Sequence, residues 1–175
     1  MRLIPLILLA LAYGLANAQD APAADAASAR EADIARIIDG IISFTQWPAA
    51  SGKVRLCLTT PVIHADALEA ELSGSTQLAD VQDLAPDDFR LDSDCDVVYI
   101  EQVDDANRAH LFQRLVGRPV LTIAGVASGC LMGSLFCLSG TGVPATFSAN
   151  LDTIARSGLR INPKVLFLAR PHQAK

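Results

Sequence analysis

The stretch that decides the fold class is Asp96–Ile123, DVVYIEQVDDANRAHLFQRLVGRPVLTI. It opens with a run of β-branched and aromatic residues, which is typical of a buried strand. Asp104 or Asp105 then caps a predicted helix that ends at Gly117, with a proline two residues beyond. A second apolar run follows over Val120–Ile123. A strand, a capped helix and a strand in this order predict an α/β layer architecture with parallel strand pairing.

The segment before this stretch repeats the alternation of strand and helix. Val54–Thr59 alternates in polarity and carries valine and leucine, so it predicts a strand. Thr60 followed by Pro61 indicates an N-cap with proline at the first helical position, and Gly74 ends that predicted helix. Ala79–Asp83 predicts a second, short strand.

The segment after the stretch changes pattern. Leu135–Ser139 and Ala145–Ala149 flank a glycine-rich turn at residues 140–142, which predicts an antiparallel hairpin at one edge of the sheet. A short helix over Asp152–Ser157 and a last helix opened by Pro163 follow. We therefore expect one α/β domain with a mixed, mostly parallel sheet flanked by helices and a C-terminal antiparallel hairpin.

The N-terminus has the pattern of a secretory signal. Arg2 precedes an apolar run over Leu3–Leu15, and the small residues at 16–18 (ANA) suit a cleavage site. These features predict a signal peptide over residues 1–18, cleaved near Ala18, and a periplasmic mature chain that begins near Gln19. No later stretch approaches the roughly 18 apolar residues of a membrane span, so we expect the mature protein to be soluble.

Residues 19–27 are predicted to form a flexible lead-in, residues 28–170 the domain and residues 171–175 a tail.

The first element of the domain is predicted to be an amphipathic helix. Ser28 and Glu31 have the spacing of a capping box. The helix should stop where Trp47 meets a proline, and we expect the Trp47 ring to fix the helix end onto the core. Isoleucines recur at helical periodicity at Ile34, Ile37, Ile38 and Ile41.

The charge of the chain excludes nucleic acid as a partner. The formal net charge is −5, and lysine and arginine are thinly spread along the sequence. Neutralising a phosphate backbone requires clustered basic residues, which this chain lacks.

Four cysteines predict two disulfides, because the chain reads as exported and the cysteine separations match no common zinc template. Three pairings are possible. The short separation and the intervening Gly133 favour Cys130 with Cys137, which leaves Cys57 with Cys95. If the strands next to Cys57 and Cys95 are neighbours in the sheet, these two residues can reach disulfide distance.

No arrangement of residues predicts catalysis or metal binding. His64, His110 and His172 are isolated from one another and from the cysteines, so we expect surface positions. Gly140–Ala145 matches a G-x-G-x-x-A dinucleotide fingerprint, but it lies between two predicted strands rather than between a strand and a helix. We therefore expect no enzymatic activity, no cofactor and no metal.

Four blocks of the sequence resemble the YfiR-type family of periplasmic regulators, and they occur in the family's order and spacing. Together they extend over essentially the whole chain after the signal sequence. The blocks are Ile41–Pro48 (IISFTQWP), Arg55–Leu58 (RLCL), Gly129–Leu138 (GCLMGSLFCL) and Asn150–Arg170 (NLDTIARSGLRINPKVLFLAR).

The resemblance implies a negative regulator in a three-component signalling system. Such a regulator binds the periplasmic domain of an inner-membrane diguanylate cyclase and represses cyclic-di-GMP synthesis, which restrains exopolysaccharide and biofilm formation. Two further partners are implied, namely an outer-membrane lipoprotein that sequesters the regulator and a second copy in a homodimer. The resemblance also implies a redox link, in which the disulfides hold the active fold and reduction derepresses the cyclase.

The candidate partner surface consists of Phe136, Ile154, Arg156 and Arg160. Phe136 directly precedes Cys137, and successive strand residues face opposite sides, so we expect Phe136 to point away from the disulfide. The alternative is that Phe136 and Ile154 belong to the core. Two other functional classes stay open: a periplasmic module that binds a small ligand at a topological switch point, and an exported hydrolase.

Overall fold

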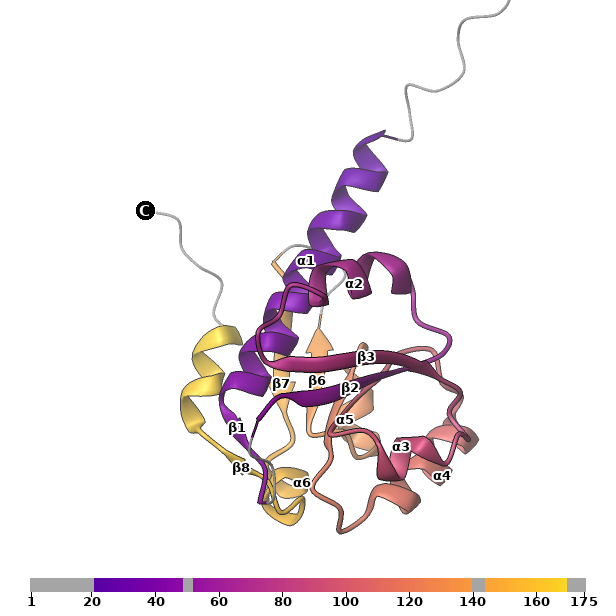
Figure 1. Cartoon of the computed structure of the whole chain (residues 1–175), viewed down its shortest axis with the longest axis vertical. Helices are drawn as coiled ribbons and strands as arrows, with labels where there is room; N and C mark the ends of the chain where they lie inside the picture. The colour runs from indigo at the N-terminus through magenta and orange to yellow at the C-terminus, as the bar shows by residue number, and fades with distance from the viewer. Residues whose placement is uncertain (1–20, 49–51, 140–143, 170–175) are drawn as a thin grey trace, which may run out of the picture.

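A six-stranded sheet forms the centre of the computed structural model, which describes residues 21–48, 52–139 and 144–169 (Figure 1). The first five strands in spatial order are parallel, and the sixth is antiparallel to its neighbour. In that order they are β3 (Leu78–Leu84), β2 (Val54–Thr59), β4 (Val97–Ile100), β5 (Leu121–Ala124), β6 (Phe136–Ser139) and β7 (Thr146–Ala149). This sheet confirms the predicted fold class. The predicted signal peptide, the hairpin turn at 140–142 and the tail lie outside the described residues.

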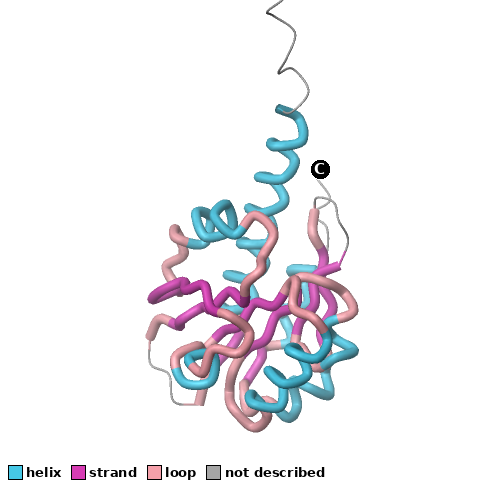
Figure 2. Tube along the Cα trace, turned by 90° about the vertical axis from the view of Figure 1, so that its right-hand side faces the viewer, coloured by secondary structure: helices cyan, strands magenta, loops and turns pink. Residues whose placement is uncertain are grey.

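Helices cover both faces of the sheet (Figure 2). Leu56 and Cys57 are consecutive in β2 and belong to different buried clusters, because strand side chains alternate between the two faces. The cluster of Leu56 includes side chains of α1 and α2, and the cluster of Cys57 includes side chains of α3 and α4. The helices are α1 (Ala21–Ser43), α2 (Ala65–Leu72), α3 (Arg90–Ser93), α4 (Asp105–Leu115), α5 (Gly129–Met132), α6 (Leu151–Arg156) and the 3-10 helix η1 (Pro163–Ala169).

Helix α1 begins at Ala21, earlier than the predicted start at Ser28. Most of the predicted lead-in is therefore helical, because alanine has the highest helix propensity and a proline is tolerated in the first turn. Figure 1 shows the first turns of α1 extending beyond the rest of the domain. The isoleucines that make up the predicted apolar stripe, Ile34, Ile37, Ile38 and Ile41, are each at most 1% exposed.

Trp47 fixes the end of this first segment to the sheet, as predicted. Its ring packs against the buried cluster under α1, and its Nε1 donates a hydrogen bond to the backbone oxygen of Asp96 at 3.3 Å. Asp96 lies directly before β4, so the contact joins the exit of α1 to the entry of a central strand.

Helix α2 begins at Ala65 and not at Pro61, so the predicted N-cap is wrong. The backbone N–H of Thr60 donates to the carbonyl of Leu84 at 2.9 Å, which extends the pairing of β2 with β3 by one residue. The side-chain Oγ1 of Thr60 also donates to the carbonyl of Leu84, at 3.4 Å, so Thr60 continues the sheet and does not cap a helix. The helix starts only after His64, which has a left-handed φ of 53°.

A second, two-stranded sheet brings the C-terminal segment back to the end of α1. Its strands are β1 (Thr45–Gln46) and β8 (Arg160–Ile161), which pair antiparallel. The sequence did not predict this pair, because two-residue strands carry no periodic pattern. Gly40 of α1 lies against η1, since a Cβ at this position would come within 2.6 Å of Leu168 Cδ1.

Candidate functional site

The disulfide between Cys130 and Cys137 joins the one-turn helix α5 to strand β6. The two Cα atoms are 5.6 Å apart, and the pairing is the one favoured from the sequence. Cys137 is fully buried, whereas Cys130 is half-buried on the outer side of the bond. The bond therefore fixes an accessible turn to a buried strand.

Asn150 connects this disulfide-linked turn to helix α6. Its Nδ2 donates to the carbonyl of Cys130 at 2.8 Å, and its Oδ1 accepts from the backbone N–H of Thr153 at 3.0 Å. The second contact makes Asn150 the N-cap of α6. Its own backbone N–H donates to the carbonyl of Leu135, next to β6, at 2.8 Å. Because one side chain bonds both α5 and α6, the position of α6 depends on the segment that the disulfide holds.

Phe136 lies in the core and not on the candidate partner surface. Its side chain is fully buried in β6 and packs edge-to-face against Phe147 of β7, with ring centroids 5.7 Å apart. The predicted alternation holds, but β7 covers the outer edge of β6, and helices cover the face to which Phe136 points. The structure thus favours the core alternative for Phe136. Ile154 is half-buried and also packs against this cluster.

Arg156 and Arg160 are exposed, at the end of α6 and in β8. Among the described residues, neither guanidinium group forms a hydrogen bond or an ion pair. The remaining described arginines all have interactions, and they are Arg30, Arg36, Arg55, Arg90, Arg108, Arg114 and Arg118. Arg156 and Arg160 therefore retain their full capacity to bind carboxylates of another molecule.

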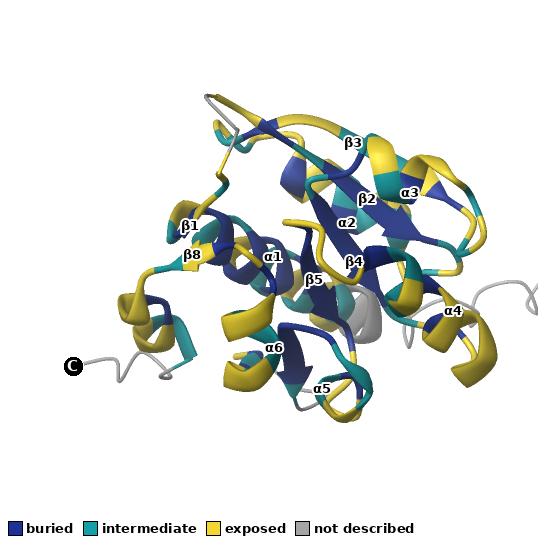
Figure 3. Cartoon of the chain, turned by 90° about the horizontal axis from the view of Figure 1, so that it is seen from below, coloured by how far each residue is buried: buried dark blue, intermediate teal, exposed yellow. Residues whose placement is uncertain are grey.

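Two exposed leucines lie on α5 and in the first turn of α6, the helix that ends at Arg156. Leu131 in α5 is 92% exposed, and Leu151 at the start of α6 is 68% exposed. Leu131 directly follows Cys130, and Leu151 directly follows Asn150, whose side chain bonds the Cys130 carbonyl. Figure 3 shows α5 and α6 close together with exposed surfaces. We call Leu131, Leu151, Arg156 and Arg160 the α5–α6 surface. Neither leucine was predicted as a surface residue, because α5 and α6 are too short to carry a periodic pattern that marks an exposed side.

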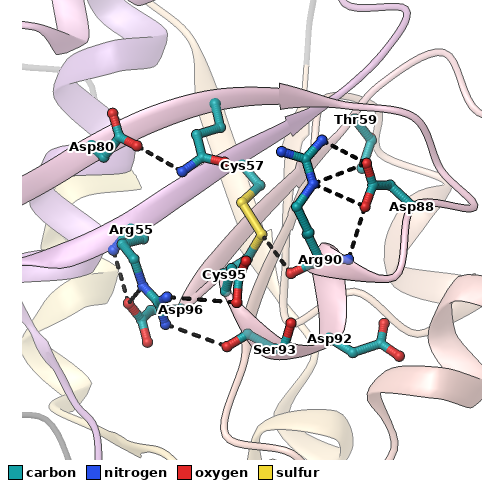
Figure 4. The surroundings of a disulfide bond; sticks show 12 residues. Arg55, Cys57, Thr59, Asp80, Asp88, Arg90, Asp92, Ser93, Cys95 and Asp96 are labelled. Atoms are coloured by element: carbon teal, nitrogen blue, oxygen red, sulfur yellow. Dashed lines mark hydrogen bonds and ion pairs between the residues drawn. A yellow bond between two sulfur atoms is a disulfide. The ribbon is translucent and has the colours of Figure 1, made fainter.

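The second disulfide, between Cys57 and Cys95, lies inside the domain (Figure 4). It joins β2 to the residue before β4 with a Cα separation of 5.8 Å, and both cysteines are at most 4% exposed. Arg55 contacts the Asp96 carboxylate at 3.3 Å, and Arg90 contacts the Asp88 carboxylate at 2.7 Å on the other side of the bond. The setting is that of a structural crosslink.

We predict that limiting dithiothreitol opens the bond between Cys130 and Cys137 before the bond between Cys57 and Cys95. Thiol exchange requires access to a sulfur atom, and only the first bond has a half-buried cysteine. Alkylation at successive times, followed by peptide mass spectrometry, measures the order. The urea-unfolded protein is the control, in which the difference in accessibility disappears. Equal rates in the folded protein, or the reverse order, would contradict the prediction.

No metal cluster occurs in the part of the chain that the structure describes. No group of three histidine, cysteine, aspartate or glutamate side chains there has the geometry to hold a metal ion. His64 and His110 are exposed, and His172 lies outside the described residues. None of the described helices is long and apolar enough to span a membrane.

These features define a disulfide-crosslinked α/β module with a mixed apolar and basic surface. The family model described as YfiR/HmsC-like matches residues 34–170, and the chain belongs to this family. The family is one of periplasmic, non-catalytic regulators of diguanylate cyclases, which agrees with the class expected from the sequence.

Proposed function

We propose that this protein represses an inner-membrane diguanylate cyclase by binding the cyclase's periplasmic domain through the α5–α6 surface. The observation that supports this proposal most is the pair of exposed arginines, Arg156 and Arg160, which have no partner among the described residues. Exposed aliphatic and arginine side chains on these neighbouring short elements suit an interface with an apolar centre and an acidic rim on the partner.

The proposed redox link acts through Asn150. Reduction of the bond between Cys130 and Cys137 frees α5, and the hydrogen bond from Asn150 to the Cys130 carbonyl then loses its fixed acceptor. Because the same side chain caps α6, Arg156 and Leu151 lose their fixed position. Reduction therefore weakens binding to the cyclase and raises cyclic-di-GMP synthesis, which favours exopolysaccharide and biofilm formation.

The proposal places the mature protein in the periplasm after removal of residues 1–18. It includes two further interactions that the family resemblance implies: sequestration by an outer-membrane lipoprotein, and formation of a homodimer. Phe136 is not proposed as a contact, because it is buried. Ile154 supports the surface from beneath through its contact with the core.

Cellular cyclic-di-GMP provides the functional test. Deleting the gene should raise cyclic-di-GMP, and complementation with the wild-type gene should restore the low level. Complementation with Leu131→Asp and Leu151→Asp together should fail although the protein reaches normal abundance, because two charges then occupy the apolar part of the interface. An unchanged cyclic-di-GMP level after deletion would contradict the proposal.

A second candidate function, a module that binds a small ligand, is favoured by one separate observation. A pocket lies at the carboxyl ends of the parallel strands, where α/β sheets commonly bind ligands. The two functions are compatible, since the pocket and the α5–α6 surface have no residue in common.

A further inference from the structure

A pocket of about 540 Å³ opens at the carboxyl ends of the parallel strands. Residues of α1, of the loop after β2 and of the segments after β4 and β5 line it. Its volume falls within the roughly 300–1,000 Å³ that small-molecule sites typically have.

The pocket lies at the topological switch point of the sheet. From β2 the chain passes to β3 on one side, and from β3 it crosses to β4 on the other side. The connections after β2 and β4 therefore leave in opposite directions and open a crevice between them. Ile63 and His64 enter the pocket from the first connection, and Glu101 and Gln102 enter it from the second.

Two carboxylates from distant parts of the sequence meet in this crevice. Glu31 of α1 is only 4% exposed and lines the pocket, and its carboxylate oxygens are not among the fully buried, unpartnered side-chain atoms of the described residues. Glu101 is half-buried, and its Oε2 accepts from the backbone N–H of Ile63 at 2.6 Å, while Tyr99 Oη lies 3.5 Å from its Oε1. The carboxylate of Glu31 thus faces the pocket, where its oxygens can accept hydrogen bonds from a bound molecule.

The residue after β5 makes room for this pair. A Cβ on Gly125 would lie 2.6 Å from Tyr99 Oη and 2.8 Å from Glu101 Cγ. The backbone of Gly125 is held by a hydrogen bond from its N–H to the carbonyl of Ile100 at 2.7 Å. Glycine is therefore required at position 125, because any side chain there would collide with Tyr99 and Glu101.

The two carboxylates of Glu31 and Glu101 repel each other, and nearby charged groups act on both. Burial raises the pKa of Glu31, and the neighbouring Glu101 raises it further, whereas His64 and Arg30 lower it. Burial also raises the pKa of Glu101, against the opposing effects of the Ile63 N–H, Arg30, Tyr99 and His64. Burial and the nearby carboxylates raise the pKa of Tyr99, so its hydroxyl stays neutral. A cation placed between the two carboxylates would relieve their repulsion.

We propose that this pocket binds a small organic ammonium compound, with Glu31 and Glu101 accepting hydrogen bonds from the ammonium group. An ammonium donates three hydrogen bonds, which suits acceptors on different walls of one cavity. A metal ion fits poorly, since no three suitable side chains come together among the described residues. Ile63, Val126 and Leu138 contribute apolar lining beside the polar residues Arg30, His64 and Gln102, so the ligand carries a compact apolar part next to its ammonium group.

Isothermal titration calorimetry of the purified oxidised protein at neutral pH tests the proposal with matched pairs of probes. The amines are propylamine, cyclohexylamine and 2-phenylethylamine, and each is compared with the alcohol of the same carbon skeleton. At least one amine should bind, and its alcohol should bind at least ~10-fold more weakly, because it cannot replace the charge-assisted hydrogen bonds. Equal binding of amine and alcohol, or no binding by any of the three amines, would overturn the proposal.

A Glu31→Gln variant identifies the responsible group. Losing one partner of a buried charge pair should weaken amine binding about 30-fold or more. The matched control is Glu71→Gln, the same change on the exposed side of α2, which should leave amine binding as it is in the wild type. Equal amine binding by Glu31→Gln and the wild-type protein would remove Glu31 from the site and overturn the proposal.

The melting temperature shows whether the Glu31→Gln variant is folded and gives a second test without ligand. Because the folded-state pKa of Glu31 lies above the ordinary 4.5, the folded protein holds a proton that the unfolded chain releases in the pH window above 4.5. The contribution of Glu31 to stability therefore falls as pH rises through this window. Glu31→Gln should melt above the wild-type protein at neutral pH, with a gain that shrinks toward pH 4.5. A lower melting temperature at neutral pH would contradict the electrostatic basis of the proposal.

Neither the calorimetric titration nor the melting measurement contains a cyclase, so their outcome is independent of the proposed repression.

Discussion

Replacing Cys57 and Cys95 together by alanine is expected to lower the free energy of unfolding by about 4 kcal/mol. The bond spans 38 residues of sequence, so its loss gives the unfolded chain much additional conformational freedom. Alanine suits the two sites because both cysteines are buried and a hydroxyl would lack a partner there. Urea denaturation followed by circular dichroism measures the effect. The loss is large against a typical domain stability of roughly 5–15 kcal/mol.

The matched control is the double replacement of Cys130 and Cys137 by alanine. This bond spans only 7 residues, so the expected loss is about 2.5 kcal/mol. The two variants thus separate a crosslink of the core from a crosslink of the α5–α6 surface. If the Cys130 and Cys137 variant proves the less stable of the two, the structural role assigned to the Cys57 bond is wrong.

Reversing the charge of both exposed arginines, in the double variant Arg156→Glu with Arg160→Glu, is expected to weaken binding to the periplasmic domain of the cyclase about 100-fold or more. Like charges brought together in an interface cost several kcal/mol, and the change places two carboxylates opposite the acidic groups proposed on the partner. Neither arginine has a partner within the described residues, so the free energy of unfolding should change little. Calorimetric titration with the isolated periplasmic domain measures the affinity.

Arg90→Glu with Arg118→Glu provides the control for net charge. Both residues are exposed, and they lie on α3 and just after α4, away from α6 in Figure 3. The control changes the total charge by the same amount, so it should lower the affinity far less than the Arg156 and Arg160 variant. Equal losses in the two variants would mean that long-range charge, and not the α5–α6 surface, governs binding.

The sequence predicted those parts of the fold that carry a periodic or capping signal. The strand over Val54–Thr59 has the predicted bounds, and Asp104 caps α4 by accepting from the backbone N–H of Ala106 and of Asn107. The disulfide pairing also followed, because the separation of Cys130 from Cys137 left one remaining pair. A local pattern or a short separation in the sequence was enough to indicate each of these features.

The parts that the sequence did not predict depend on contacts between distant segments. Alternation along β6 gave the direction of Phe136, but only the packing of distant side chains, including those of α1, shows that this face is covered. Glu31 and Glu101 meet because α1 packs across the switch point, and neither residue stands in a recognisable motif. One signal was available: Glu101 directly follows the buried run of β4, at the sheet edge where α/β proteins bind ligands.

We propose that the oxidised protein binds the periplasmic domain of a diguanylate cyclase through a surface that the disulfide between Cys130 and Cys137 holds in place. The measurement is a titration of the oxidised protein with the periplasmic domain of an inner-membrane diguanylate cyclase of the same organism, repeated after reduction of that bond alone. We predict tight binding in the oxidised state and weaker binding after reduction. The absence of binding to this domain by the folded, oxidised protein would contradict the claim.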